Sequence, residues 1–364
     1  MPQRPDAPFW LTLEAVPGLG PDGVRRLLQA FPSVAAVCQA RPAQLAPLVG
    51  DKLAHGIAAA AATAATDAAT ILQAGLDWLA APENHLITWD DPAYPGQLRD
   101  LPDAPAWLYV KGDPAWLARP MLAIVGSRHA TPQGLRDACA FAEALSEAGL
   151  TIVSGLALGV DAAAHEGGLK GLASSVAVVG TGLDRVYPAR NRELAHRLAA
   201  GGAIVSEFPV GTAPKRGHFP RRNRLISGLS LGVLVVEAAL QSGSLITARL
   251  AAEQGRDVFA LPGSIHSPLS KGCHRLIKQG AKLVESARDI LEELGCRLPA
   301  SSPGVAVSTP PDELLEALAG GPLAPDQLAN RLCLTVETLS VRLLAAEMDG
   351  RVARLPGGLY QRLF

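Results

Sequence analysis

Short apolar runs alternate with longer amphipathic stretches through the middle of the chain, from residue 121 to residue 297. Each run is nearly continuous in Val, Ile, Leu and Ala, which is typical of strands buried on both faces of a parallel sheet. The pattern predicts seven strands: Leu122–Val125, Thr151–Val153, Val176–Val179, Ala203–Ser206, Leu231–Val236, Val258–Leu261 and Lys282–Val284. Helical stretches between most of them indicate an α/β domain with a doubly wound, Rossmann-like, mostly parallel sheet.

The first 80 residues have a helical pattern instead and predict a small N-terminal domain. The turn Val16-Pro-Gly-Leu-Gly20 precedes an amphipathic stretch, as in helix-hairpin-helix or SAM-like domains, whose backbone N–H groups can hold a phosphate. Because only Arg25 and Arg26 supply nearby positive charge, we expect a packing or partner-binding module, with DNA contact as the alternative. Residues 81–120 are rich in proline and aromatic side chains and predict an irregular connector with one extended run, Trp107–Val110.

The C-terminal part of the chain begins after a stretch rich in proline and serine, residues 298–311, which predicts a linker. Residues 312–364 then predict a winged-helix domain, with a hairpin that turns at Gly357-Gly358 and three helices near 312–319, 325–332 and 335–348. A third helix that reads DNA should be basic. This one carries a single arginine, Arg342, among three acidic residues, which favours a partner-binding or regulatory domain over duplex binding.

Candidate ligand-binding groups follow several of the predicted strands. Gly126-Ser127-Arg128 follows the first strand, Gly155 the second, and Gly243-Ser244 the fifth. Glycine lets a ligand approach the backbone, and helix N-termini present free N–H groups to anions. Ligands of doubly wound sheets bind at this edge. Several anion subsites along one edge favour a polynucleotide strand over a mononucleotide.

A cluster of positive charge lies between the fourth and fifth strands. Residues 215–224 hold five cations and no acid, together with Phe219 and Asn223; the cations are Lys215, Arg216, Arg221, Arg222 and Arg224. Guanidinium groups suit phosphate, and an aromatic ring can stack on a base. The alternative is a charged, solvated surface, for which Phe219 and Asn223 would be unusual choices. Net charge agrees with a polyanion site, since it is −4 in residues 1–120, +5 in 121–297 and −2 in 298–364.

Enzyme motifs are missing from the sequence. A phosphate loop of the form GxxxxGK[ST] does not occur, and the first strand is followed by GSRHAT rather than by GxGxxG, so neither ATP hydrolysis nor a dinucleotide cofactor is expected. Asp161 and His165 lie one turn apart on a predicted helix, and we interpret them as a structural hydrogen bond rather than a catalytic dyad. Glu207 and Glu237 end apolar strands, where they could orient the arginines, as we favour, or act as general bases. No catalytic residue, metal ligand or cofactor is predicted.

The five cysteines are scattered without paired spacing, which fits a reducing cytoplasm better than a disulfide framework or a zinc site. The first ten residues, MPQRPDAPFW, lack the pattern of a signal peptide. The alanine-rich run 58–70 is interrupted by polar residues and predicts a helix outside the membrane. These features favour a cytoplasmic protein without membrane contact.

Residues 121–284 resemble the DprA family, also called Smf, of bacterial DNA-processing proteins. The resemblance is carried, in the family's order, by the runs AIVGSR, IVSGLALGVDAAAH, VAVVGTGLDRVYPARN, IVSEFPVG, FPRRNRLISGLS, VVEA, SGSLITA and GRDVFALPG. The upstream residues Tyr94–Asp113 are similar to the lead-in of the family. Because the matching runs cover most of the middle segment, the resemblance is specific.

The resemblance implies an extended Rossmann fold that binds single-stranded DNA without catalysis, usually as a homodimer. It also implies protection of incoming DNA and loading of the recombinase RecA during natural transformation and recombination. The resemblance implies that Ser127 and Arg128 bind phosphate, that Phe219 stacks on a base, and that the following polar residues grip the backbone: Arg216, Arg221, Arg222, Asn223 and Arg224. The alternative left open by the residues is a nucleotide-processing hydrolase of similar fold, with Glu207 or Glu237 as its base.

Overall fold

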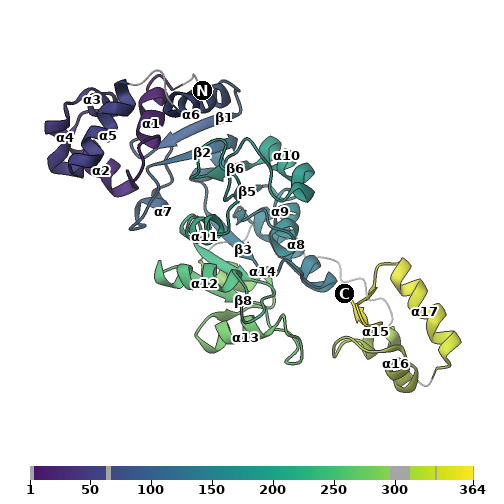
Figure 1. Ribbon diagram of the computed structural model, residues 1–364. Helices are drawn as coiled ribbons and strands as arrows, with labels where there is room; N and C mark the ends of the chain where they lie inside the picture. The colour runs from purple at the N-terminus through teal and green to yellow at the C-terminus, as the bar shows by residue number, and fades with distance from the viewer. Residues whose placement is uncertain (1–3, 63–66, 296–311, 333, 364) are drawn as a thin grey trace.

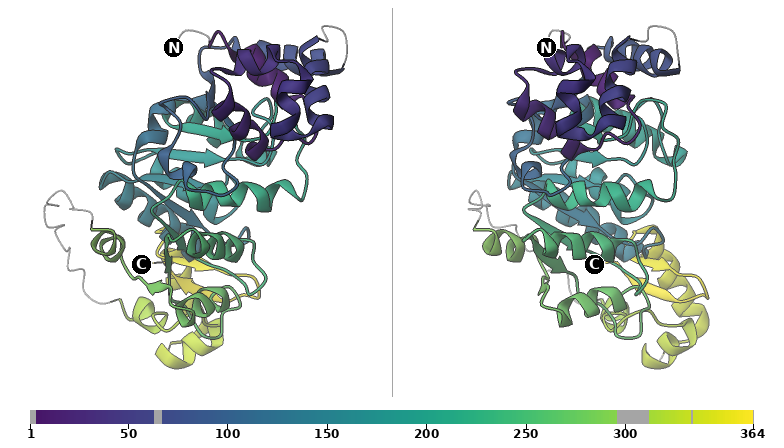
Figure 2. Two further views of the ribbon diagram at one scale, coloured as in Figure 1. Left: turned by 90° about the vertical axis from the view of Figure 1, so that its left-hand side faces the viewer. Right: turned by 60° about the vertical axis from the view of Figure 1, so that its left-hand side comes forward.

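The structure is a computed structural model of the 364-residue chain and describes residues 4–62, 67–295, 312–332 and 334–363. A helical domain, a central α/β domain and a winged-helix domain follow one another along the chain (Figure 1). Two further views show the helical domain at one end of the α/β domain and the winged-helix domain at the other (Figure 2). Within the described ranges, no helix is both long enough and apolar enough to cross a bilayer.

The central domain is built on a nine-stranded sheet in the order β1-β2-β6-β5-β4-β3-β7-β8-β9. All seven predicted strands are present and parallel, so the predicted fold class is confirmed. They are β3 (Met121–Val125), β4 (Thr151–Ser154), β5 (Ser175–Val178), β6 (Ala203–Ser206), β7 (Gly232–Val235), β8 (Asp257–Ala260) and β9 (Lys282–Leu283). The chain winds outward from β3 in one direction and from β7 in the other. The switch point of the sheet therefore lies between β3 and β7, where such folds bind ligands.

The connector predicted at residues 81–120 is in fact part of the sheet. Strands β1 (Asn84–Thr88) and β2 (Trp107–Gly112) pair antiparallel, and β2 pairs antiparallel with β6. The extended run at Trp107–Val110 was predicted, whereas β1 was not. Strand β1 begins with the polar pair Asn84-His85, so its sequence lacks the continuous apolar run that marks the parallel strands.

Helices cover both faces of the sheet, as buried parallel strands require. Leu225, Ala248 and Leu276 pack on one face, from α11 (His218–Gly228), α12 (Ser244–Glu253) and α13 (Lys271–Lys278). The opposite face is covered by α8 (Pro132–Glu147), α9 (Val160–Gly168), α10 (Arg192–Gly201) and α14 (Ala287–Glu293). Shorter segments complete the domain: α7 (Gly96–Arg99) and the 3₁₀ turns η1 (Pro114–Ala118) and η2 (Ala189–Asn191).

The N-terminal domain consists of α1 (Ala7–Glu14), α2 (Pro21–Ala30), α3 (Val34–Gln39), α4 (Pro42–Val49), α5 (Asp51–Ala62) and α6 (Asp67–Leu79). It is fixed to the sheet domain through Glu14, whose carboxylate accepts hydrogen bonds from Trp107 Nε1 at 2.9 Å and Tyr109 Oη at 2.5 Å. Burial raises the pKa of Glu14 to about 7, although both hydrogen bonds favour the charged form. The contact ties α1 to β2, the second strand of the sheet.

The predicted hairpin between α1 and α2 is present, but its cations are engaged within the protein. Arg25 pairs with Asp22, donates to the carbonyl of Pro102 at 2.8 Å and stacks over Trp89. Arg26 donates weakly to the carbonyl of Asp22. These contacts favour the predicted packing role of the hairpin over a role in DNA contact.

The predicted winged-helix domain is confirmed. It contains α15 (Glu313–Ala317), α16 (Pro325–Leu332), α17 (Val336–Met348) and a hairpin of β10 (Val352–Arg354) and β11 (Tyr360–Arg362). Gly357 and Gly358 form the turn of the hairpin with φ angles of 88° and 75°, which only glycine adopts readily. The core of this domain is separate from that of the sheet domain and is centred on Leu314, Leu328 and Leu343.

Candidate functional site

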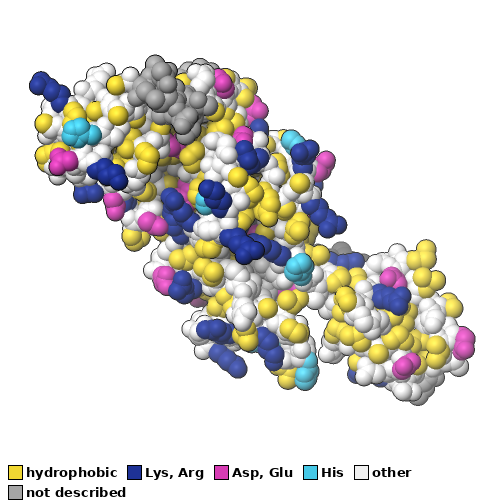
Figure 3. Space-filling view, in the orientation of Figure 1, with side chains coloured by type: hydrophobic (Ala, Val, Ile, Leu, Met, Phe, Trp, Pro, Cys, Tyr) yellow, Lys and Arg dark blue, Asp and Glu magenta, His cyan; other side chains and the backbone are white. Residues whose placement is uncertain are grey.

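A cleft of about 730 Å³ opens at the carboxyl ends of the central strands, next to the switch point of the sheet. Its walls come from the loops after β3, β4 and β7, from the loop that contains Tyr187, and from α11. Lys and Arg side chains gather over the middle of the molecule in this region (Figure 3). Nine of the thirteen predicted site residues line the cleft: Gly126, Ser127, Arg128, Arg216, Phe219, Arg222, Asn223, Gly243 and Ser244.

Helix α11 decides which part of the FPRRNR run faces this cleft. Phe219, Arg222, Asn223 and Ile226 line it and follow the i, i+3, i+4, i+7 spacing of one helix face. Arg221 and Arg224 lie on another face and are absent from the cleft wall. Lys215 precedes the helix, is exposed, and also lies outside the wall.

The loop after β3 is held tightly against the start of α9. Val160 N donates to the carbonyl of Ser127 at 3.1 Å, and Gly159, with a φ of 80°, leaves no room for a side chain because a Cβ there would lie 2.3 Å from that carbonyl. Ser127 Oγ accepts from His129 N at 3.0 Å. Arg128 extends from this loop until its guanidinium carbon lies 5.9 Å from the centre of the Phe219 ring. The loop thus presents a cation beside an aromatic ring.

Arg222 is a buried part of the cleft floor. Its Nη1 donates to the carbonyls of Gly155, at 2.6 Å, and of Val178, and its Nε donates to Asn223 Oδ1 at 2.9 Å. Burial lowers the pKa of Arg222 to about 10, so it stays charged at neutral pH. A Cβ at Gly155 would lie 2.2 Å from this guanidinium. Gly155 therefore makes room for Arg222, and not for a ligand as its position after a strand had suggested.

Arg221 and Arg224 are both held by Glu207. Arg221 lies 3.1 Å from the Glu207 carboxylate, and Arg224 pairs with the same carboxylate and, at 3.1 Å, with Asp103. Burial raises the pKa of Glu207, and the two guanidinium groups oppose that shift. The prediction that Glu207 orients arginines is confirmed. Arg224 is 6% exposed and stabilises the fold from outside the cleft.

The same prediction is wrong for Glu237. Its carboxylate accepts from the backbone N–H of Thr131 at 2.9 Å and from the Thr131 hydroxyl at 2.6 Å. Thr131 caps α8, so Glu237 fixes the start of that helix through Thr131. The spacing of strand ends gave no indication of this partner, because Thr131 is distant in the chain.

Asp161 and His165 fasten the loop after β4 to α9. Asp161 Oδ2 accepts from Gly155 N at 3.1 Å, while His165 Nε2 accepts from Leu156 N at 3.3 Å and its Nδ1 lies 2.7 Å from Ser175 Oγ. Burial lowers the pKa of His165 to about 3, and the positive charge of Arg222 adds to the shift. The interpretation of a structural role is confirmed, although each side chain bonds to the loop rather than to the other.

Tyr187 is a site residue that the sequence reasoning did not assign. Its ring centre lies 5.7 Å from that of Phe219, and the side chain is 47% exposed. The only signal was its place in the VYPARN run, which supported the resemblance without suggesting a role. Together the two rings and Arg128 line a small recess of about 80 Å³ next to the main cleft. The recess offers apolar ring faces beside a cation.

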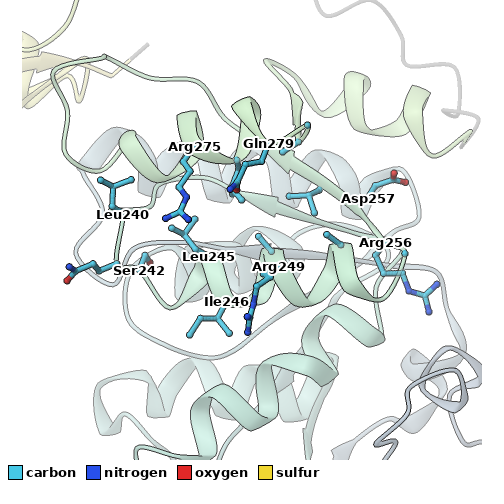
Figure 4. A pocket seen from close by; sticks show the side chains of 17 residues that line it. Leu240, Ser242, Leu245, Ile246, Arg249, Arg256, Asp257, Arg275 and Gln279 are labelled. Carbon is cyan, nitrogen blue, oxygen red and sulfur yellow. The ribbon is translucent and has the colours of Figure 1, made fainter.

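A larger cavity of about 810 Å³ lies between α12, α13 and β8. Figure 4 shows Leu245 and Ile246 together with three arginines around it: Arg249, Arg256 and Arg275. None of the predicted site residues lines this cavity. It shares Gln241 and Ser242 of the loop after β7 with the cleft, but no aromatic ring among the described residues lines it. We place the candidate site in the smaller cleft, where cations, backbone N–H groups and aromatic rings converge.

The fold and the cleft define a class of proteins with a Rossmann-type α/β core, a cleft lined by arginines next to the switch point and an appended winged-helix domain. Residues 85–295 match the family described as DNA recombination-mediator protein A, and residues 298–358 match the DprA winged helix domain. The chain belongs to this family. The resemblance found in the sequence is therefore confirmed.

Individual relatives agree with this assignment. The chain is 46% identical to Protein Smf of Escherichia coli (strain K12), over 80% of this chain and 81% of that protein. The X-ray structure of DNA processing protein A from Streptococcus pneumoniae is similar, with a TM-score of 0.68, 38% identity, and coverage of 78% of this chain and 95% of that one. DNA processing protein A from Helicobacter pylori, whose structure is described by its single-stranded DNA binding mode, has a TM-score of 0.53 and 33% identity, and the similarity covers 58% and 95% of the two chains.

Proposed function

We propose that the chain binds single-stranded DNA in the cleft between the β3 loop and α11. Arg128 and Arg216 would neutralise phosphates, while Phe219 and Tyr187 would stack on bases. Stacking on an aromatic ring contributes about 1–3 kcal/mol per base and tolerates any sequence. The bases of a duplex are already stacked inward, so the same rings favour a single strand.

The observation that carries this proposal is the position of the Arg128 guanidinium beside the Phe219 ring, inside a cleft also lined by Arg216 and Asn223. A phosphate and its neighbouring base need one cation and one ring face at this kind of separation. The N-terminus of α12, preceded by Gly243, supplies further N–H groups at the same edge. The name of the Helicobacter pylori relative, which refers to single-stranded DNA, supports the same ligand.

Binding without catalysis is part of the proposal. Glu207 and Glu237, which were the candidate bases of a hydrolase, are engaged with arginines and with Thr131 and do not line the cleft. We further propose that the protein acts in the cytoplasm as a homodimer, protects incoming strands and loads RecA onto them. Family membership supports these finer roles.

A titration of the full chain with a labelled poly-dT oligonucleotide tests the proposal. Fluorescence anisotropy should show saturable binding that weakens as salt rises, because phosphate neutralisation releases counterions. A duplex of equal length should bind more weakly at both of two salt concentrations. Absence of strand binding, or turnover of a mononucleotide in its place, would contradict the proposal and favour the hydrolase.

A further inference from the structure

Four buried side chains hold the backbone of the loop that follows β4. The loop residues that they bind are 155–157, and the four side chains are Asp161, His165, Asn191 and Arg222. Within this loop Leu156 has a φ of 55°, a left-handed conformation that is unfavourable for leucine. Strain of this kind persists only where surrounding contacts over-determine it, and it is frequent at functional sites. The side chains that hold the loop are therefore candidates for a role in the site.

Asn191 supplies the contacts that complete the hold on this loop. Its Nδ2 donates to the carbonyl of Leu156 at 2.9 Å and to that of Ala157 at 3.1 Å. The N–H groups of the same two residues donate to His165 and to Asp161. Without Asn191 the two carbonyls would lose these donors while the N–H groups kept their acceptors. The strained part of the loop would then be held on one side only.

The backbone of Asn191 belongs to the segment that carries Tyr187. Asn191 N donates to the carbonyl of Pro188 at 3.0 Å and so closes η2, which begins two residues after Tyr187. The Tyr187 ring is half exposed and lies against the ring of Phe219. Residues 187 and 188 line the same recess as residues 155–158 of the loop after β4. Asn191 therefore joins two walls of the recess.

A purely structural role for a buried asparagine is the alternative, and Asn84 provides the comparison. Asn84 is 8% exposed against 7% for Asn191, and its Nδ2 donates to the carbonyl of Trp78 at 2.7 Å. It lies on the edge strand β1, which contributes nothing to the cleft wall or to the recess. The two asparagines thus make the same kind of bond at the same depth. Only Asn191 makes it between segments that line the candidate site.

We propose that Asn191 is a positioning residue for strand binding, which fastens the Tyr187 segment to the loop after β4 and thereby sets the Tyr187 ring beside Phe219. Ring centres that already lie 5.7 Å apart give a base a stacking surface that needs no rearrangement. Such preorganisation adds affinity because side chains need not be ordered on binding. This role rests on the proposed strand binding, whereas the placement of Tyr187 is a property of the free protein. Asn191 itself touches no DNA and acts through Tyr187.

Titration of the full chain with poly-dT tests this role. Asn191→Ala should weaken binding about ten-fold, on the scale of one lost stacked base, with an unchanged salt slope because no phosphate contact is lost. Asn84→Ala is the matched control and should bind like the original protein. Adding Asn191→Ala to Tyr187→Ala should cause no further loss, because both changes act through one ring. Additive losses, or equal affinities of Asn191→Ala and Asn84→Ala, would overturn the proposal.

Fluorine NMR of the free protein keeps the test independent of DNA. In protein labelled with 3-fluorotyrosine, the signal of Tyr187 is identified by its loss in Tyr187→Phe. Asn191→Ala should shift this signal, whereas Asn84→Ala should not. The three other tyrosines, whose signals show that each variant is folded, are Tyr94, Tyr109 and Tyr360. An unshifted Tyr187 signal in folded Asn191→Ala protein would overturn the proposal.

A milder variant covers the case in which Asn191→Ala does not fold. Asn191→Ser keeps one hydroxyl donor for the two carbonyls, so it should shift the Tyr187 signal and weaken binding by less than ten-fold. Binding and a Tyr187 signal identical to those of the original protein would overturn the positioning role. If the original protein fails to bind poly-dT while its Tyr187 signal responds to these changes, the proposed DNA function is wrong and the positioning of Tyr187 by Asn191 stands.

Discussion

The guanidinium group of Arg128 lies against the ring of Phe219, with 5.9 Å between its central carbon and the ring centre. Arg128 comes from the loop after β3 and Phe219 from the first turn of α11, the helix that leads from β6 to β7. The pair places charge recognition and stacking side by side. Replacing Arg128 should therefore change the salt dependence of strand binding, whereas replacing Phe219 should change the affinity alone.

Arg128→Ala should weaken binding of poly-dT and make its salt dependence shallower. Loss of one phosphate contact lowers the slope of log K against log salt by about 0.7 for a single strand. Anisotropy titrations at several salt concentrations measure both quantities. Arg288→Ala is the matched control, because that arginine is exposed on α14 and pairs with Glu292. An Arg128→Ala protein with the slope of the control would contradict the assigned phosphate contact.

Phe219→Ala should weaken strand binding by about 1–3 kcal/mol without changing the salt slope, because stacking releases no counterions. Phe219→Tyr keeps a ring face in the cleft and should bind nearly as well as the original protein. The same titrations measure both variants. A changed slope with unchanged affinity at low salt would show that the ring does not stack on a base.

Replacing Arg222 should mainly lower the stability of the fold, because its side chain is buried beneath the cleft. Arg222→Ala leaves the buried carbonyls of Gly155 and Val178 without their donor, at a cost of roughly 2–4 kcal/mol. The stability of Arg222→Lys should lie between those of the original protein and Arg222→Ala, because an ammonium group lacks the planar fork that reaches both carbonyls. Urea unfolding followed by circular dichroism measures the loss. An unchanged midpoint for Arg222→Ala would contradict its place in the cleft floor.

Glu207 and Arg224 form a buried pair, so Arg224→Ala should destabilise the fold by up to roughly 3–5 kcal/mol, because the buried carboxylate keeps only the exposed Arg221 as an ion-pair partner. Adding Glu207→Gln to Arg224→Ala should recover part of this loss, since the amide carries no charge. Urea midpoints of the two single variants and the double variant measure the coupling. Strictly additive losses would exclude the pairing as the cause.

His165 should make the protein less stable in acid. Its pKa is about 3 in the folded state against an ordinary value near 6.5, so between these values the unfolded chain binds a proton that the folded chain does not. The contribution of His165 to the free energy of unfolding should be fully present above pH 6.5. It should fall as the pH drops below 6.5, by up to about 1.4 kcal/mol per pH unit. His165→Gln should remove that part of the slope. Glu14, whose raised pKa acts in the opposite direction, is present in both proteins and cancels in the comparison. Parallel stability–pH curves would contradict the prediction.

The sequence by itself determined the seven parallel strands, the glycine loops that follow them and the winged-helix tail. Apolar runs and turn residues are local signals. A strand that is buried on both faces of a sheet must be apolar at nearly every position, so its sequence is easily recognised. It also placed seven of the thirteen DNA-binding candidates in one short cationic stretch, residues 215–224. Strand β1 was not predicted, because an edge strand with polar ends lacks a continuous apolar run.

Only the tertiary structure decided what each member of that stretch does. The direction in which α11 packs on the sheet turned Phe219 and Asn223 into the cleft and turned Arg221 and Arg224 toward Glu207. The role of Gly155 was likewise decided by the tertiary structure, because the Arg222 side chain from α11 occupies the space that a side chain at position 155 would need. Local sequence fixes residue types and their spacing along a helix. The partners of those residues depend on contacts between segments far apart in the chain, which exist only once the sheet and its helices have packed.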